Sequence, residues 1–137
     1  DIILSTTRPY LGAFAIVPET FDGCVCSSGF ALATGLRSKN IDPQYLLLFL
    51  KSDAGLRQFE RRMTGGLYPA IVQGELEKVK VPTLPLEKQK EIVAAVQAGR
   101  LRIRSELENA RRKAEKEMAE LDSLMLDARP RVRGIHG

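Results

Sequence analysis

The sequence predicts an α+β fold that is followed by one long α-helix. Short apolar runs separated by turn residues fill the first 85 residues, a pattern typical of strands interleaved with helices. Residues 86–128 contain one glycine, no proline and no aromatic residue, which indicates an uninterrupted helix. We therefore expect a first unit over residues 1–85, a long spacer or dimerisation helix over 86–128, and a basic tail over 129–137.

Composition favours a globular protein and argues against a membrane-spanning one. The chain has 137 residues, of which 44% are hydrophobic, so it can bury a core. No apolar run approaches the roughly 18 residues that a membrane-spanning helix needs. The formal net charge of +4 permits nucleic acid as a partner without demanding it. Because the chain begins within an apparent strand, Ile2–Ser5, and has no signal peptide, we expect a cytoplasmic protein and a fragment of a longer one.

Strand signals dominate the beginning of the first unit. Apolar runs flanked by turn residues predict strands. The runs are Ile2–Ser5, Ala13–Val17, Cys24–Cys26 and Phe30–Thr34.

Helix signals follow. Asp42 can cap exposed amides and Pro43 fits a first turn, so a helix over Gln44–Ser52 is expected. A second helix, Ala54–Met63, ends at the Gly65-Gly66 pair. After it we expect a short turn or helix around Gln73–Leu76 and a strand over Val79–Val81.

The long helix, Glu87–Ala128, carries a heptad-like stripe. From residue 89 to residue 124, positions that step alternately by four and three are apolar at eight of eleven places, which predicts a coiled-coil seam. At about 1.5 Å per residue the helix would be about 60 Å long, more than one small domain can cover. The small Ala110 and Ala114 at its centre favour close approach of a partner helix. Pro130 ends the helix before the basic tail.

Side chains for catalysis or metal binding are sparse. Cys24 and Cys26 form one pair with no second cluster, and the single histidine, His136, lies in the tail, so we expect no metal site and two reduced, packed thiols. No P-loop, nucleophile–histidine pair, Asn-Pro-Pro-Tyr/Phe methyltransferase motif or glycine-rich cofactor loop occurs. The residues predict a non-catalytic protein without a cofactor.

Several segments resemble one known family. The stretches Gly66–Ile71, Leu76–Pro82 and Leu84–Val93 are similar to the end of a target recognition domain in the specificity (S) subunits of type I restriction–modification systems, where "L-x-x-Q-x-x-I-V" opens a conserved spacer helix. Asp1–Gly12 and Asn40–Leu46 resemble upstream motifs of the same family. The likeness covers nearly all of residues 1–127.

The resemblance implies a role. S subunits have two target recognition domains that each read half of a split sequence in double-stranded DNA, separated by antiparallel spacer helices. Those helices set the distance between half-sites and dock the methyltransferase (M) subunits. The R subunit would be an indirect partner of this chain. This chain would then hold part of one recognition domain and one spacer helix, which pairs with a second spacer helix from the same full-length subunit or from a homodimer mate.

The turns of the first unit offer candidate DNA-binding residues, and the long helix offers candidate helix-pairing residues. Cations, hydroxyls, aromatics and glycines in turns are the types that contact phosphates and bases. They are Thr7, Arg8, Tyr10, Arg37, Lys39, Arg61, Arg62, Thr64, Gly65, Gly66 and Tyr68. The expected helix-pairing residues are Val93, Val96, Ile103, Leu107, Ala110, Ala114, Leu121 and Leu124. The alternative is a coiled-coil oligomerisation module that does not bind DNA.

Overall fold

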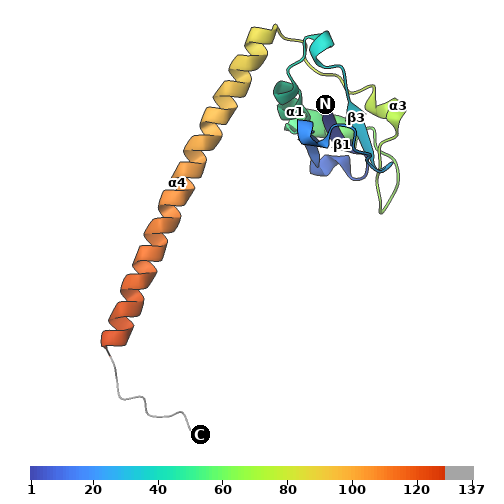
Figure 1. Cartoon of the computed structure of the whole chain (residues 1–137). Coiled ribbons are helices and arrows are strands. Elements are labelled where there is room, and N and C mark those ends of the chain that lie inside the picture. Colours follow the sequence, from blue (N-terminus) through green and yellow to red (C-terminus); the bar gives the residue numbers. More distant parts are fainter. Residues whose placement is uncertain (129–137) are drawn as a thin grey trace. The chain divides into compact units, whose positions relative to one another are not determined.

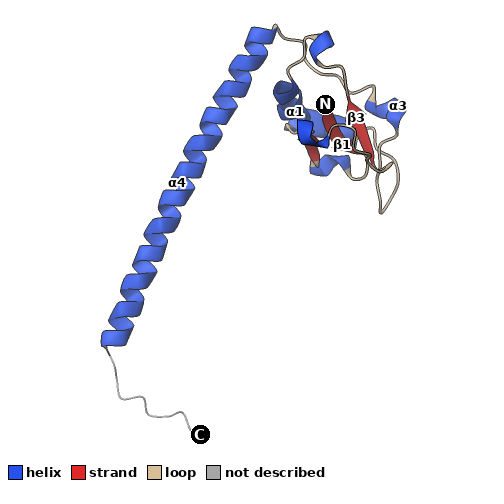
Figure 2. Ribbon diagram, viewed as in Figure 1, coloured by secondary structure: helices blue, strands red, loops and turns tan. Residues whose placement is uncertain are grey.

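The computed structural model describes residues 1–128, and the predicted basic tail, residues 129–137 with His136, lies outside the described residues. The chain divides into two compact units (Figure 1). The first unit, as the name is used from here on, covers residues 1–95 and so includes ten residues beyond the 1–85 expected from sequence, and the second unit begins at Val96. A small sheet with short helices is followed by a long helix (Figure 2), which confirms the predicted α+β class. Among residues 1–128 no helix is long and apolar enough to cross a bilayer.

The sheet of the first unit has three antiparallel strands in the order β2-β1-β3. The central strand β1 (Ile2–Ser5) pairs with β2 (Phe14–Ile16) and with β3 (Phe30–Ala33). Leu4 lies opposite Phe14 in one ladder and opposite Ala31 in the other. Three of the strands expected from sequence are therefore present and share one sheet.

The core lies on one face of this sheet. Strand alternation points Ile2, Leu4 and Phe14 to that face, where all three are buried. Helices α1 (Pro43–Leu50) and α2 (Asp53–Glu60) belong to the same buried cluster, and the rings of Phe14 and Phe59 lie 5.0 Å apart. The alternate positions of β3, Phe30 and Leu32, remain exposed.

Both helices begin with a side-chain cap. The Asp42 carboxylate accepts hydrogen bonds from the backbone amides of Gln44 and Tyr45, at 2.8 and 3.0 Å, as the Asp-Pro signal predicts. The Ser52 hydroxyl caps α2. Helix α2 ends at Glu60, earlier than expected, because the amides of Arg62 and Met63 both turn back to the carbonyl of Phe59.

Two predicted strands are wrong. Residues 24–26 lie in an open loop after the 3₁₀ turn η2 (Glu19–Phe21), and both cysteines are exposed rather than packed. The segment Val79–Val81 also pairs with no strand. The Gln58 amide instead accepts from the Lys80 N–H and donates to its carbonyl, both at 2.9 Å, so a side chain occupies the groups that a ladder would use.

The long helix α4 (Leu86–Asp127) has 42 residues and agrees closely with the predicted Glu87–Ala128. Its N-terminal turns follow the short helix α3 (Gln73–Leu76) and an extended linker that ends in Pro85. From residue 100 to the end of the helix every described side chain is exposed. Charged side chains on this part form exposed pairs four residues apart, such as Arg111 with Glu115 at 3.0 Å.

Gln89 ties the start of α4 to the rest of the first unit. Its side chain is 1% exposed and is buried within that unit. The amide oxygen accepts from the backbone N–H of Asp42 at 2.8 Å, and the amide nitrogen donates to the carbonyls of Asn40 and Leu84, at 3.0 and 2.8 Å. One side chain therefore joins the cap of α1, the linker and the first turn of α4.

We expect Gln89→Leu to lower the free energy of unfolding of the first unit by about 2–3 kcal/mol, because a buried backbone group that loses its partner costs about 1–3 kcal/mol. Urea denaturation of the purified chain measures this loss. Lys90→Leu, which introduces leucine at the exposed neighbouring position, serves as the control. Equal stability of the two variants would contradict the anchoring role of Gln89.

Candidate nucleic-acid interface

A strained turn follows β1. Arg8 has φ 47° and ψ 52°, a left-handed conformation that is uncommon for residues other than glycine. Its backbone N–H donates to the carbonyl of Pro69 at 2.8 Å, and the Ser5 hydroxyl donates to the carbonyl of Thr7 at 2.9 Å. Hydrogen bonds on both sides of the turn therefore hold Arg8 in this conformation, and its side chain is exposed.

A second loop, residues 64–70, lies beside this turn. Thr64 and Ala70 exchange two backbone hydrogen bonds of 2.8 Å each, which close the base of the loop. Gly65 has φ 103°, and a Cβ atom there would lie 3.0 Å from the carbonyl oxygen of Tyr68. Glycine is therefore required at this position. A Cβ atom at Gly66 would meet nothing within 4 Å, so the second glycine has no such constraint.

Ala70 joins the two loops. It forms an antiparallel bridge with Thr64 and another with Thr7, and the next amide, that of Ile71, donates to the carbonyl of Thr6 at 2.9 Å. The Arg8 guanidinium carbon lies 5.3 Å from the centre of the Tyr68 ring, a cation–π contact. Two segments that are some sixty residues apart in sequence thus present one surface.

We call this surface the loop cluster. Its members are all exposed and include a cation, two threonine hydroxyls, a phenol ring and an aliphatic side chain. They are Thr7, Arg8, Thr64, Gly65, Gly66, Leu67 and Tyr68. An arginine can bind a phosphate or the edge of a guanine, hydroxyls accept and donate to either, and aromatic or aliphatic side chains contact bases and thymine methyl groups.

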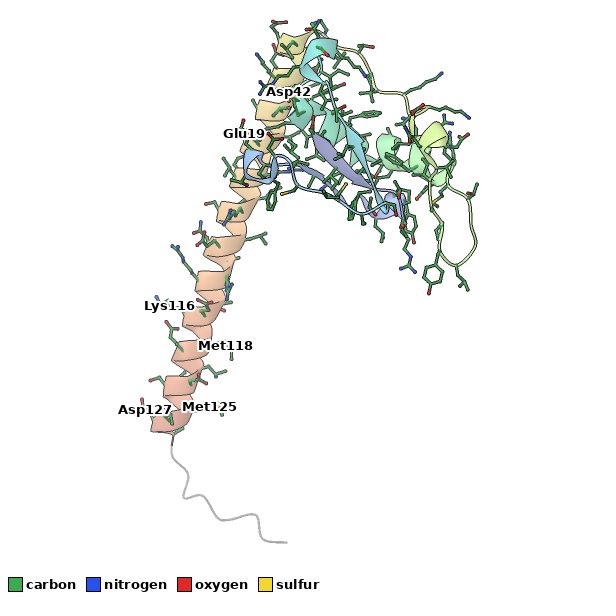
Figure 3. All side chains as sticks on the ribbon, turned by 45° about the vertical axis from the view of Figure 1, so that its right-hand side comes forward. Glu19, Asp42, Lys116, Met118, Met125 and Asp127 are labelled. Carbon is green, nitrogen blue, oxygen red and sulfur yellow. The ribbon has the colours of Figure 1, made fainter. Side chains whose placement is uncertain are left out.

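The structure keeps other candidate residues apart from the loop cluster. Tyr10 is half-buried in the 3₁₀ turn η1 (Pro9–Leu11), which packs on α2. Arg37 and Lys39 belong to the 3₁₀ turn η3 (Arg37–Lys39), next to the Asn40 carbonyl that Gln89 binds. In Figures 1 and 3 the cyan η3 turn lies beside the start of α4, and the yellow-green 64–70 loop lies toward the other end of the first unit.

The two arginines that follow α2 have different surroundings. Arg61 is exposed at the end of the helix. Arg62 is partly buried and its guanidinium lies 3.6 Å from the carboxylate of Glu75. A hydrogen bond from Lys78, together with the charges of Lys78 and Arg62, holds the pKa of Glu75 below its ordinary value. Arg62 therefore has an internal partner, whereas Arg61 faces solvent.

Leu67 was not among the residues expected from sequence. Its side chain is 89% exposed, and the neighbouring Tyr68 is 74% exposed, so the 64–70 loop carries two large apolar groups into solvent. An exposed leucine between glycine and tyrosine in a polar turn is the signal that could have identified it. Such a side chain can contact bases or enter a groove.

The expected helix-pairing residues divide into two groups. Val93 is buried within the first unit, and Val96 is half-buried. The remaining six lie exposed on the second unit. They are Ile103, Leu107, Ala110, Ala114, Leu121 and Leu124.

Comparison with known proteins identifies the family. A family model described as the type I restriction modification DNA specificity domain matches residues 1–115. No curated protein and no solved structure matches the chain significantly. Because the family model matches most of the chain, the chain belongs to the type I restriction modification DNA specificity family, whose domains recognise DNA sequence.

The two glycines of the loop provide a matched pair of variants. Gly65→Ala should lower the free energy of unfolding by about 1–2 kcal/mol, because an L-residue is strained at this positive φ and its Cβ would crowd the Tyr68 carbonyl. Gly66→Ala should change it by less than about 0.5 kcal/mol, since the position is open. Chemical denaturation of both variants measures the difference. A larger loss for Gly66→Ala would contradict the loop geometry.

Proposed function

We propose that this chain reads one half of a bipartite DNA sequence through the loop cluster, and that α4 docks methyltransferase subunits and sets the distance between the two half-sites. The proposal gives the first unit, with its loops, the reading role and the second unit the measuring role. Methylation and cleavage would reside in the partner M and R subunits, and the chain itself would turn over no S-adenosylmethionine.

The observation that carries the reading role is the convergence of two loops on Ala70. Backbone hydrogen bonds hold both loops, so the exposed side chains of Arg8, Leu67 and Tyr68 are not needed to maintain the fold beneath them. A preformed surface of this kind loses little conformational entropy when it binds DNA. Family membership supplies the class of ligand, and the mixture of charged, hydroxyl and aromatic side chains fits the contacts that DNA requires.

The measuring role is supported by the anchoring of α4. A helix can act as a spacer only if one end is fixed to the domain that reads DNA. Gln89 provides such a fixed point, since its three hydrogen bonds lie within the first unit. Beyond it the helix continues without proline to Asp127, so each added residue changes the distance by about 1.5 Å.

A second candidate function is a coiled-coil scaffold without a DNA contact. The exposed apolar stripe on α4 favours this alternative, because it requires a partner but not a nucleic acid. Salt dependence separates the two functions. A DNA reader loses affinity steeply as salt rises, because contacts with phosphates release counterions, whereas a scaffold shows no specific DNA binding to lose.

Arg8→Gly tests the reading role and separates it from stability. Glycine accepts the left-handed conformation, so the free energy of unfolding should stay within about 1 kcal/mol of the wild-type value. The affinity of the assembled complex for its target DNA should fall by about tenfold or more, and the slope of log affinity against log salt should decrease by about one if Arg8 contacts a phosphate.

Arg37→Ala is the control, since it removes an equal charge from η3, away from the loop cluster. DNA affinity measured by fluorescence anisotropy at several salt concentrations should fall less for Arg37→Ala than for Arg8→Gly. An equal or larger loss for Arg37→Ala would exclude the loop cluster as the main contact.

Insertion of one heptad between Glu108 and Asn109 tests the measuring role. Seven residues keep the apolar stripe in phase and add about 10 Å, close to three base-pair steps of about 3.4 Å. Mapping of methylated sites for the assembled complex should show a longer non-specific spacer and unchanged half-sites. Replacement of the native heptad by the inserted one, without a change in length, is the control. Altered half-site bases with an unchanged spacer would contradict the division of roles.

A further inference from the structure

The loop that follows η2, residues 22–29, carries the two cysteines of the chain into solvent. Cys24 and Cys26 are free thiols and both are exposed, and Val25 between them is 98% exposed. Thiols in this position pack against nothing in the core of the first unit, and neither belongs to the loop cluster. Two accessible nucleophiles one residue apart are therefore a chemical feature that neither the fold nor the reading role uses.

Both cysteines line a cavity on the face of the sheet opposite the core. The cavity has a volume of about 760 Å³, within the range of roughly 300–1,000 Å³ that small-molecule sites occupy. Ile3 and Leu32, which face each other across β1 and β3, form part of its apolar wall, and Phe21 adds an aromatic ring. A small molecule can therefore enter a partly apolar cavity and reach either thiol.

We propose that Cys24 and Cys26 form a dithiol site that a small-molecule disulfide oxidises to an intrachain disulfide. The thiolate of one cysteine attacks a sulfur of the small disulfide, forms a mixed disulfide with it and expels one small thiolate. The thiolate of the other cysteine then attacks the protein sulfur of the mixed disulfide, forms the Cys24–Cys26 bond and expels the second small thiolate. Each protein thiol releases one proton, and the two electrons reduce the small disulfide to two thiols.

The backbone between the two cysteines can bend to close this bond. Consecutive Cα atoms are about 3.8 Å apart, so those of Cys24 and Cys26 are separated by at most about 7.5 Å, and a disulfide requires about 4.4–6.8 Å. Among residues 1–128, no backbone hydrogen bond involves the N–H or the carbonyl of Val25 or Cys26. A bend at Val25 therefore brings the thiols together without breaking a bond of the fold.

Hydrogen bonds on both sides confine the change to the loop. The Cys24 N–H donates to the carbonyl of Phe21 at 3.1 Å, and the carbonyl of Gly29 accepts from both the N–H and the hydroxyl of Thr6, each at 2.9 Å. The sheet and the loop cluster thus keep their hydrogen bonds in the reduced and the oxidised chain. A disulfide that spans one residue is strained as well as exposed, and disulfides of that kind are readily reduced, so the exchange is reversible.

The charges around the cavity select among small disulfides. Asp1, Glu19 and Asp22 line it, and its lining includes no lysine, arginine or histidine. The sequence from Pro9 to Leu36 also contains no lysine or arginine. The local charge is therefore negative although the whole chain carries a formal net charge of +4. A cationic disulfide is attracted to this cavity and an anionic one is repelled, the reverse of the order that the net charge alone predicts.

The first test treats the complete reduced chain with cystamine, a cationic disulfide, at mildly alkaline pH and follows the products by mass spectrometry. The wild-type chain should lose two hydrogens and keep no adduct, and dithiothreitol should reverse the change. Cys24→Ser and Cys26→Ser should each keep one cysteamine adduct, because the second thiol is missing. Cys26→Ser combined with Glu60→Cys is the control, since it keeps two thiols but places one on α2, across the sheet from the cavity, and it should keep two adducts.

The second test compares rates at low salt. Cystamine should react about tenfold or more faster than dithiodiglycolate, an anionic disulfide, and Glu19→Gln with Asp22→Asn should reduce this ratio by about threefold or more. Glu106→Gln with Asp122→Asn removes the same charge from α4 and should leave the ratio within about twofold.

Three results would overturn the proposal. They are adducts that persist on the wild-type chain, crosslinked dimers in place of the intrachain disulfide, and equal rates for the two small disulfides. Neither test contains DNA or another subunit, so a failure of the dithiol site is distinct from a failure of the reading role.

Discussion

The buried amide of Gln89 is the interaction on which the arrangement of the first unit depends. A primary amide has both a donor and an acceptor, and here it serves the Asp42 N–H on one side and two carbonyls on the other. A leucine would supply the apolar volume but no partner for these groups, and a glutamate could not donate to the carbonyls. Tyr45 extends the connection, because its hydroxyl donates to the carbonyl of Pro82 at 3.1 Å in the linker that leads to α4. The helix thus starts from a point set by directional bonds.

Directional bonds would matter for the measuring role that we propose for α4. Apolar packing alone tolerates sliding, since hydrophobic contact has little directional preference. Hydrogen bonds weaken steeply when they lengthen or bend. The position of the first turn of α4 within the first unit is therefore fixed more tightly than a valine or leucine contact would fix it. Val93, one helical turn further on, adds burial to an alignment that Gln89 has already set.

Local signals predicted the helices well and the long-range contacts poorly. Asp42 and Pro43 located α1, and the absence of proline and the scarcity of glycine located α4, because both signals act within a few residues. The Val79–Val81 segment has strand-like residues, yet the distant side chain of Gln58 occupies the backbone groups of Lys80. The exposure of Cys24 and Cys26 likewise depends on which strands form the sheet, which composition does not reveal.

In the candidate interface, too, the sequence predicted residue types but not the long-range contacts that bring them together. The sequence identified Thr7, Arg8, Thr64 and Tyr68 as residue types suited to DNA, but their meeting depends on hydrogen bonds to Ala70, a residue with no chemical signal of its own. Gln89 lay on the predicted helix seam as a polar exception, and its role became clear only from its partners in the first unit. In both cases the deciding contacts join residues that are far apart in the chain.

The construction of the loop cluster lets its exposed side chains vary without loss of the fold, which suits the reading role that we propose. Apart from the bond of the Ser5 hydroxyl to Thr7, the bonds that hold the two loops run between backbone groups of Arg8, Thr64, Pro69 and Ala70, so they do not depend on which side chains those four positions carry. Side chains at the exposed positions can then be replaced at little cost in stability, because surface substitutions away from buried contacts usually change it by less than about 0.5 kcal/mol. Two positions are exceptions: the φ of 103° at Gly65 excludes other residues, and the left-handed backbone at Arg8 is uncommon for residues other than glycine. If the loop cluster reads DNA as we propose, backbone bonds separate the residues that would choose a DNA sequence from those that maintain the fold, and Gln89 keeps that fold in a fixed relation to the first turn of α4.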